Sequence, residues 1–119
     1  MKVEICIDNI ESAKLLIPYS PRIDRIELCS SLALDGLSPS PSLVHFCREN
    51  LPDIQRHVMI RPRAGDFIYE NDYAKVMLDE ISMFHKIGIH GIVFGALTIE
   101  SEIDYEKTKL ITEEAKRLN

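Results

Sequence analysis

The chain has 119 residues, of which 45% are hydrophobic and 28% are charged, a composition typical of one globular domain spanning residues 1–119. Its formal net charge of -5 provides no excess of positive charge for binding a polyanion, and no apolar run reaches the roughly 20 residues of a membrane span. Three cysteines are an odd number, which argues against a disulfide framework. The sequence therefore predicts a reduced, cytoplasmic protein with no nucleic-acid or membrane partner.

Apolar residues recur with a period of two in short segments, which predicts strands. Between these segments they recur at helical spacing, which predicts helices. Asp8 or Asn9 begins the first helix, and Gly88 is the expected end of the third. Ser40 or Ser42 begins the second helix after a turn-rich loop. In chain order, the predicted elements are a strand at 3–8, a helix at 10–17, a strand at 25–29, a helix at 41–50, a strand at 57–61, a helix at 71–87, a strand at 91–95 and a helix at 104–118.

Four successive strand–helix units predict an α/β fold with parallel strands joined by right-handed crossovers. Parallel strands covered by helices on both faces would be apolar on both faces, but here one face is polar. A polar face suits the interior of a (β/α) barrel of the TIM type, and four units make about half of such a barrel. The residues predicted to share this face are Glu4, Cys6, Glu27, Cys29, Met59 and Arg61.

A charged segment follows the third predicted strand, at the end of a barrel where active sites are built. Arg61 and Arg63 are two residues apart, and paired guanidinium groups suit a phosphate or a carboxylate. Asp66 lies in the same loop, at the predicted barrel mouth. The alternative is structural: the two arginines neutralise Glu4 and Glu27 inside the barrel.

Two cysteines are predicted at the ends of adjacent strands, on the same face. Cys6 and Cys29 could share one ion, with Met59 of the next strand as a third ligand. Two thiolates and a thioether form a soft ligand set that favours Cu(I). The alternative is that both cysteines are packing residues, as Cys47 is expected to be on its helix.

The chain resembles the N-terminal half of the CutC copper homeostasis family. The matching segments occur in the family's order and nearly at its spacing, from one end of the chain to the other. They are Val3-Glu4-Ile5-Cys6, Asp24-Arg25-Ile26-Glu27-Leu28-Cys29, Gly36-Leu37-Ser38-Pro39-Ser40, Met59-Ile60-Arg61-Pro62-Arg63-Ala64-Gly65-Asp66-Phe67 and Gly91-Ile92-Val93-Phe94-Gly95-Ala96-Leu97.

The resemblance implies a (β/α) barrel, a cytoplasmic location and a role in copper binding or tolerance. The family's E-x-C and E-L-C motifs correspond to Cys6 and Cys29. Its double glycine is replaced by Asp35-Gly36, and its second half, with the T-F-H-R-A-F-D motif, is absent from this sequence. Any mechanism that needs that second half cannot operate in this sequence alone.

Two functions follow as hypotheses. The first is copper homeostasis, with Cu(I) bound by Cys6, Cys29 and Met59. The second is a barrel enzyme for a small phosphorylated or carboxylated metabolite, held by Arg61 and Arg63, with Glu4 or Glu27 as the acid–base group. In either case a half barrel leaves strand edges open, so we expect a homodimer or a separate second half to cover them.

Overall fold

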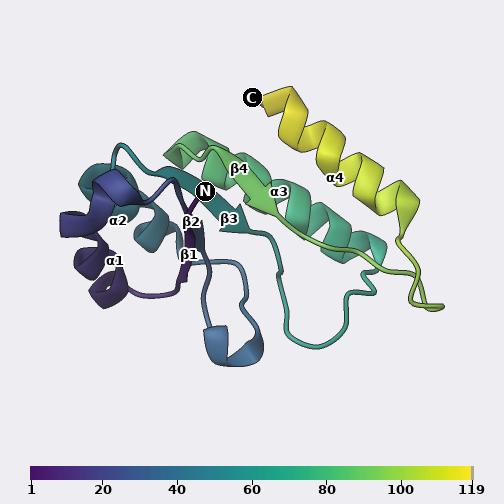
Figure 1. Cartoon of the computed structure of the whole chain (residues 1–119). Coiled ribbons are helices and arrows are strands. Elements are labelled where there is room, and N and C mark those ends of the chain that lie inside the picture. The colour runs from purple at the N-terminus through teal and green to yellow at the C-terminus, as the bar shows by residue number, and fades with distance from the viewer. Residues whose placement is uncertain (119) are drawn as a thin grey trace.

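The computed structural model describes residues 1–118, in which one parallel sheet is covered by helices (Figure 1). Within these residues the strand order is β1-β2-β3-β4, and every neighbouring pair is parallel. This arrangement confirms the α/β half-barrel prediction. The elements are β1 (Glu4–Ile7), α1 (Ile10–Leu16), the 3-10 helix η1 (Ile17–Arg22), β2 (Arg25–Leu28), the 3-10 helix η2 (Leu32–Leu34), α2 (Pro41–Asn50), β3 (Gln55–Met59), α3 (Asn71–Ile87), β4 (Gly91–Val93) and α4 (Tyr105–Leu118).

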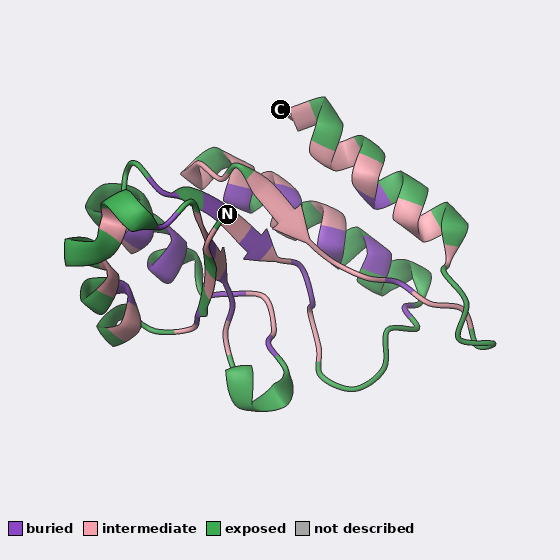
Figure 2. Cartoon of the chain, in the orientation of Figure 1, coloured by how far each residue is buried: buried purple, intermediate pink, exposed green. Residues whose placement is uncertain are grey.

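The hydrophobic core lies between the sheet and the helices. Ile26, Leu28 and Val58 point from the strands toward the helices and are completely buried. The alternate positions of β1, β2 and β3 are half-buried or exposed, and Figure 2 shows this alternation on β3, whereas β4 is half-buried throughout. The sheet therefore has one apolar, helix-covered face and one polar face, as the period of two predicts. The helices complete the core with Ala13, Leu43, Val44, Cys47, Ala74, Met77, Ile81, Phe84 and Ile111.

The third strand begins earlier than the sequence pattern predicts. β3 covers Gln55–Met59, whereas the expected range was 57–61. Gln55 belongs to the strand because its N–H donates to the carbonyl of Asp24 at 3.1 Å. At the other end, the Ser38 N–H donates to the carbonyl of Arg61 at 2.9 Å, so the chain after β3 is bonded to the β2–α2 loop.

The first helix ends one residue before its predicted end, but the chain stays helical beyond it. α1 ends at Leu16 and continues directly as η1, a 3-10 helix that also contains Pro21. Pro18 is accepted because it occupies the first turn of η1, where a backbone N–H would have no helical partner.

An arginine that the pattern did not single out is buried on the apolar side of β3. Arg56 is only 7% exposed, and its guanidinium donates to backbone carbonyls at the ends of α2 and α3. The acceptors are the carbonyls of Gly88 at 3.2 Å, Leu51 at 3.3 Å and Ile54 at 3.1 Å. Arg56 thus satisfies carbonyl oxygens that a helix end and a turn would otherwise leave buried without a donor.

Gly91 has a steric role on the polar face. A Cβ atom at this position would lie 2.7 Å from Cε1 of His57, which belongs to the neighbouring strand. The ring of His57 therefore packs directly on the backbone of β4, and glycine is the residue that permits this contact.

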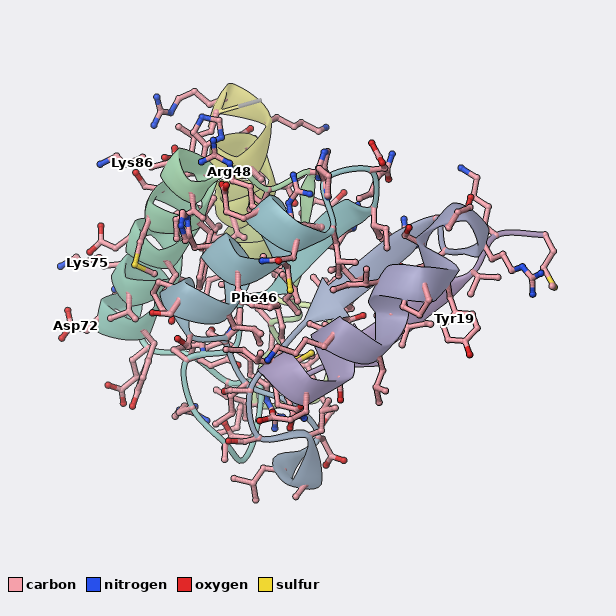
Figure 3. The ribbon with its side chains drawn as sticks, turned by 90° about the vertical axis from the view of Figure 1, so that its left-hand side faces the viewer. Tyr19, Phe46, Arg48, Asp72, Lys75 and Lys86 are labelled. Carbon is pink, nitrogen blue, oxygen red and sulfur yellow. The ribbon has the colours of Figure 1, made fainter. Side chains whose placement is uncertain are left out.

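The outer side of the helical layer is polar. Figure 3 shows Asp72, Lys75 and Lys86 of α3 pointing away from the protein. In residues 1–118, each helix is either too short or too polar to cross a membrane.

Candidate functional site

The polar face of the sheet and the loops at its carboxyl edge form the candidate site. The long connections after β2 and β3 lie on the same side of the sheet (Figure 1). Ligand sites in parallel α/β folds are built at this edge, because the strands end together and the loops supply side chains.

Glu4 and Glu27, the predicted acid–base candidates, lie on this face. Neither of them forms an ion pair with Arg61 or Arg63 among the described residues. Glu4 forms an ion pair with Arg25, directly opposite it on β2. The pKa of Glu27 is raised, first by burial and then by the adjacent carboxyl group of Glu4. The proposal that Arg61 and Arg63 neutralise Glu4 and Glu27 is therefore wrong for Glu4, and Glu27 has no ion pair among the described residues.

The two thiols lie beside the same carboxylate. The strand register places Cys6 opposite Glu27, so Cys6 and Cys29 are staggered along the sheet rather than level with each other. The Cys29 thiol lies 3.9 Å from Oε1 of Glu27, and Cys6 lies directly opposite Glu27 on the neighbouring strand. Cys6 is exposed and Cys29 is completely buried, so the two thiols differ in their access to solvent.

Both thiols hold their protons at neutral pH. Burial raises the pKa of Cys29 to about 12, and the negative charge of Glu27 adds to this rise. Burial also raises the pKa of Cys6, again with contributions from Glu27 and Glu4. Neither cysteine is thus an activated nucleophile, and a metal ion that bound here would have to displace protons.

Met59 and Cys29 meet at a left-handed glycine in the β2–α2 loop. Gly36 has a φ of 87°, and a Cβ on it would lie 2.9 Å from Sδ of Met59 and 3.6 Å from Cβ of Cys29. A side chain at this position would push the thioether away from the buried cysteine. The Asp35-Gly36 turn, in which Asp35 is also left-handed, thus leaves room for two of the three predicted copper ligands beside it.

The two arginines of the charged segment point to different partners. Arg61 is 7% exposed and donates to the carbonyls of Leu34 at 2.9 Å, Gly36 at 2.8 Å and Gly65 at 3.0 Å. These bonds join the β2–α2 loop to the β3–α3 loop, while Nε of Arg61 has no partner. Arg61 has no carboxylate partner among the described ion pairs.

Arg63 is bonded within its own loop. Its guanidinium pairs with Asp66 at 2.9 Å and donates to the carbonyls of Asp66 and Ile68 at 2.9 and 2.6 Å. This pair lowers the pKa of Asp66. The guanidinium also lies about 5 Å from the rings of Tyr69 and Tyr73. Asp66 lies in the β3–α3 loop, where its carboxylate holds Arg63 in place.

Two residues that the sequence reasoning missed connect this site to α3. The hydroxyl of Ser38 donates to Oε2 of Glu80 at 2.7 Å and accepts the backbone N–H of Arg61 at 2.9 Å. Burial raises the pKa of Glu80. Glu80 could have been identified from the sequence, because it precedes Ile81 and follows Met77 by three residues, which places it on the inward side of the predicted helix.

The donor types near the site limit its metal chemistry. In the part of the chain that the structure describes, no three His, Cys, Asp or Glu side chains are close enough together to hold a metal ion. Zinc and calcium centres are usually built from such groups. The sulfur atoms of Cys6, Cys29 and Met59, in contrast, are soft donors on one face of the sheet, a chemistry that suits Cu(I).

Comparison with known proteins identifies the family. The model of the CutC family matches residues 1–119. A CutC family protein of Glaesserella parasuis is 45% identical over 111 residues, covering 93% of this chain and 44% of the relative. The copper homeostasis protein cutC homolog of Caenorhabditis elegans is 41% identical over 116 residues, covering 98% of this chain and 46% of the relative.

The structural comparison agrees with the sequence comparison. The crystal structure of a CutC protein from Streptococcus agalactiae matches with a TM-score of 0.88 at 28% identity, covering 98% of this chain and 56% of that one. The chain spans about half the length of the curated relatives it matches. The protein described here belongs to the CutC family.

Proposed function

We propose that this chain is a cytoplasmic copper homeostasis protein that binds Cu(I) through Cys6 and Cys29, with Met59 as the third ligand. The observation that carries the proposal is the placement of both thiols beside Glu27 on the open face of the sheet. Met59 and Cys29 both lie beside Gly36, where a Cβ atom would contact each of them. The name of the Caenorhabditis elegans relative supports a connection with copper.

The exposure of the two thiols suggests an order of binding. Cys6 is exposed and can receive the ion from solvent or from a carrier. Cys29 is buried next to Met59 and would complete a site shielded from water. Glu27 lies beside both thiols and is placed to accept a proton when the metal replaces it.

Replacing both cysteines tests this assignment. The double variant Cys6→Ser and Cys29→Ser should lose stoichiometric Cu(I) uptake under reducing conditions, because a hydroxyl is a poor ligand for this soft ion. Uptake is measured by competition with a chromophoric Cu(I) chelator. The control is Cys47→Ser, which removes a buried thiol of α2 outside the polar face and should leave uptake unchanged. Full uptake by the double variant would refute the assignment.

We also propose that the open edges of the sheet are covered in a homodimer or by a second half barrel. Among the described residues, β1 and β4 each have a partner strand on one side only. Ile99, Ile103 and Tyr105, beyond β4, are at least 66% exposed. Unpaired edges and exposed apolar side chains favour association.

Native mass spectrometry distinguishes these two arrangements. A dimer of the purified chain would support closure by a second copy. Dissociation of that dimer by Ile103→Glu, with Glu102→Gln as the surface control, would place the contact beside α4. A chain that stays monomeric at every concentration would contradict the homodimer and would leave a separate second half as the partner.

A further inference from the structure

A pocket of about 240 Å³ opens at the carboxyl ends of β3 and β4. It lies at the edge where parallel α/β folds bind small molecules. Its volume corresponds to a small metabolite rather than to a bare metal ion. The lining residues are Asp35, Met59, Ile60, Arg61, Phe67, Val93, Phe94 and Gly95.

The polar group that stands out in this pocket is the guanidinium of Arg61. Three carbonyl oxygens accept hydrogen bonds from its Nη1 and Nη2 atoms. A guanidinium has five donors, so Nε and one further Nη2 donor stay unused by the protein, and Nε is buried without a partner. These two nitrogens form one edge of the planar fork, the arrangement that binds a carboxylate or phosphate with two parallel bonds.

Arg61 also has no ion pair among the described residues, although Asp35 lines the same pocket. The Arg61 side chain is more than nine-tenths buried, and Asp66, the acidic residue nearest in sequence, is paired with Arg63 instead. A buried cation is costly unless an anion compensates it. Carbonyl oxygens accept hydrogen bonds from Arg61, but they do not neutralise its positive charge.

Apart from Arg61 and the exposed Asp35, the pocket is lined by apolar side chains and backbone, which suit the carbon skeleton of an organic ligand. The ring of Phe67 lies 4.9 Å from the guanidinium carbon of Arg61, and Phe94 and Val93 form further walls. Gly95 leaves space beside Phe67, since a Cβ there would be 3.9 Å from Cδ1 of that ring. The combination of a cationic end and aromatic walls favours an oxyanion attached to an apolar group.

We propose that this pocket binds a small organic oxyanion, a carboxylate or a phosphate monoester, with the oxyanion on Arg61 and the carbon skeleton against Phe67 and Phe94. The site does not use the two cysteines and goes beyond copper binding, although Met59, the third ligand of the proposed copper site, also lines the pocket. It uses Arg61 alone, because the guanidinium of Arg63 is committed to Asp66 and Ile68.

The test is a titration with benzoate and phenyl phosphate, followed by amide chemical shifts of the ¹⁵N-labelled full chain. Saturable shifts should appear at Phe67, Val93 and Gly95, and benzyl alcohol, which has the ring but no charge, should bind at least about tenfold more weakly. The relative affinity for the two anions distinguishes a carboxylate site from a phosphate site. Absence of saturable shifts with both anions, or equal binding of the alcohol, would overturn the proposal.

Two variants locate the site. Arg61→Lys keeps the charge but loses the planar fork, and should weaken binding by about tenfold or more. Gly95→Val fills the pocket without touching the carbonyl bonds of Arg61, so it keeps the proposal testable if Arg61→Lys fails to fold. Arg117→Gln removes a surface cation of α4 and is the control with unchanged affinity. Unchanged binding in a folded Gly95→Val variant would refute the location.

The same titration on the Cys6→Ser and Cys29→Ser double variant separates this proposal from copper binding. The anion should bind this variant as it binds the original chain. Loss of copper uptake with retained anion binding would show that the anion binds without the two thiols, whereas loss of both in a folded variant would contradict a pocket that depends on Arg61.

Discussion

The affinity of the chain for Cu(I) is expected to rise steeply with pH. Both thiols are protonated near neutrality, since burial and the charge of Glu27 raise the pKa values of Cys6 and Cys29, the latter to about 12. Each bound thiolate releases one proton, so the binding constant should rise by about tenfold per pH unit for each cysteine, and by about a hundredfold for both. Chelator competition between about pH 6 and about pH 8 measures this slope, after correction for the chelator's own protonation.

Variants of single cysteines show how much each cysteine contributes to the pH dependence of the Cu(I) binding constant. Cys6→Ser or Cys29→Ser should reduce the slope to about one proton, whereas Cys47→Ser should leave it at about two. Glu27→Gln removes the negative charge beside both thiols, which lowers their pKa values and should strengthen binding at the acidic end of the range. A binding constant that does not change with pH would exclude thiolate ligands altogether.

Replacing Arg56 by methionine should destabilise the fold by about 3–5 kcal/mol, the cost typical of breaking a buried polar network. Methionine has a similar length but leaves the carbonyls of Leu51, Ile54 and Gly88 without their donor. Each buried acceptor that loses its partner costs about 1–3 kcal/mol. The measurement is urea unfolding at neutral pH, with the free energy obtained by linear extrapolation.

Arg48 offers a matched control for this experiment. It donates to the carbonyl of Ile87 at 2.9 Å, next to the Gly88 carbonyl that Arg56 serves, but its side chain is 50% exposed. Figure 3 shows Arg48 at the outer surface of α2. Water can replace its hydrogen bond, so Arg48→Met should cost about 0.5 kcal/mol or less. Equal losses in the two variants would show that burial of the arginine is not what matters.

The fold could be predicted largely from hydrophobic periodicity, because each strand has one buried and one open face. The pattern placed β1, β2, α2 and α3 within a residue or two of their observed ends. It failed at the start of β3, where Gln55 and Arg56 interrupt the apolar alternation. The acceptors of Arg56 follow the end of α2, lie on the turn after it and follow the end of α3, and a local pattern contains no information about their convergence.

The sequence predicted which face of the sheet carries the residues of the candidate site, but not which residues they pair with. Alternation was enough to place Cys6, Glu27 and Met59 on the polar side of the sheet. Ion pairs depend on register, which the sequence does not specify, so Arg25 rather than Arg61 pairs with Glu4. The position of Arg61 likewise depends on carbonyl oxygens of two loops, and any residue type could supply those carbonyls.

Arg63 makes its hydrogen bonds within its own loop, and this affects how a second half barrel or a ligand would dock there. Its bonds to Asp66 and Ile68 and its contacts with Tyr69 and Tyr73 organise the β3–α3 loop using only residues of that loop and the first turn of α3. Ordering a backbone costs about 1–2 kcal/mol per residue, and here that entropy is lost when this chain folds. The loop is therefore preorganised, so a second half barrel or a ligand that docks on it meets a rigid surface and associates without a further ordering penalty.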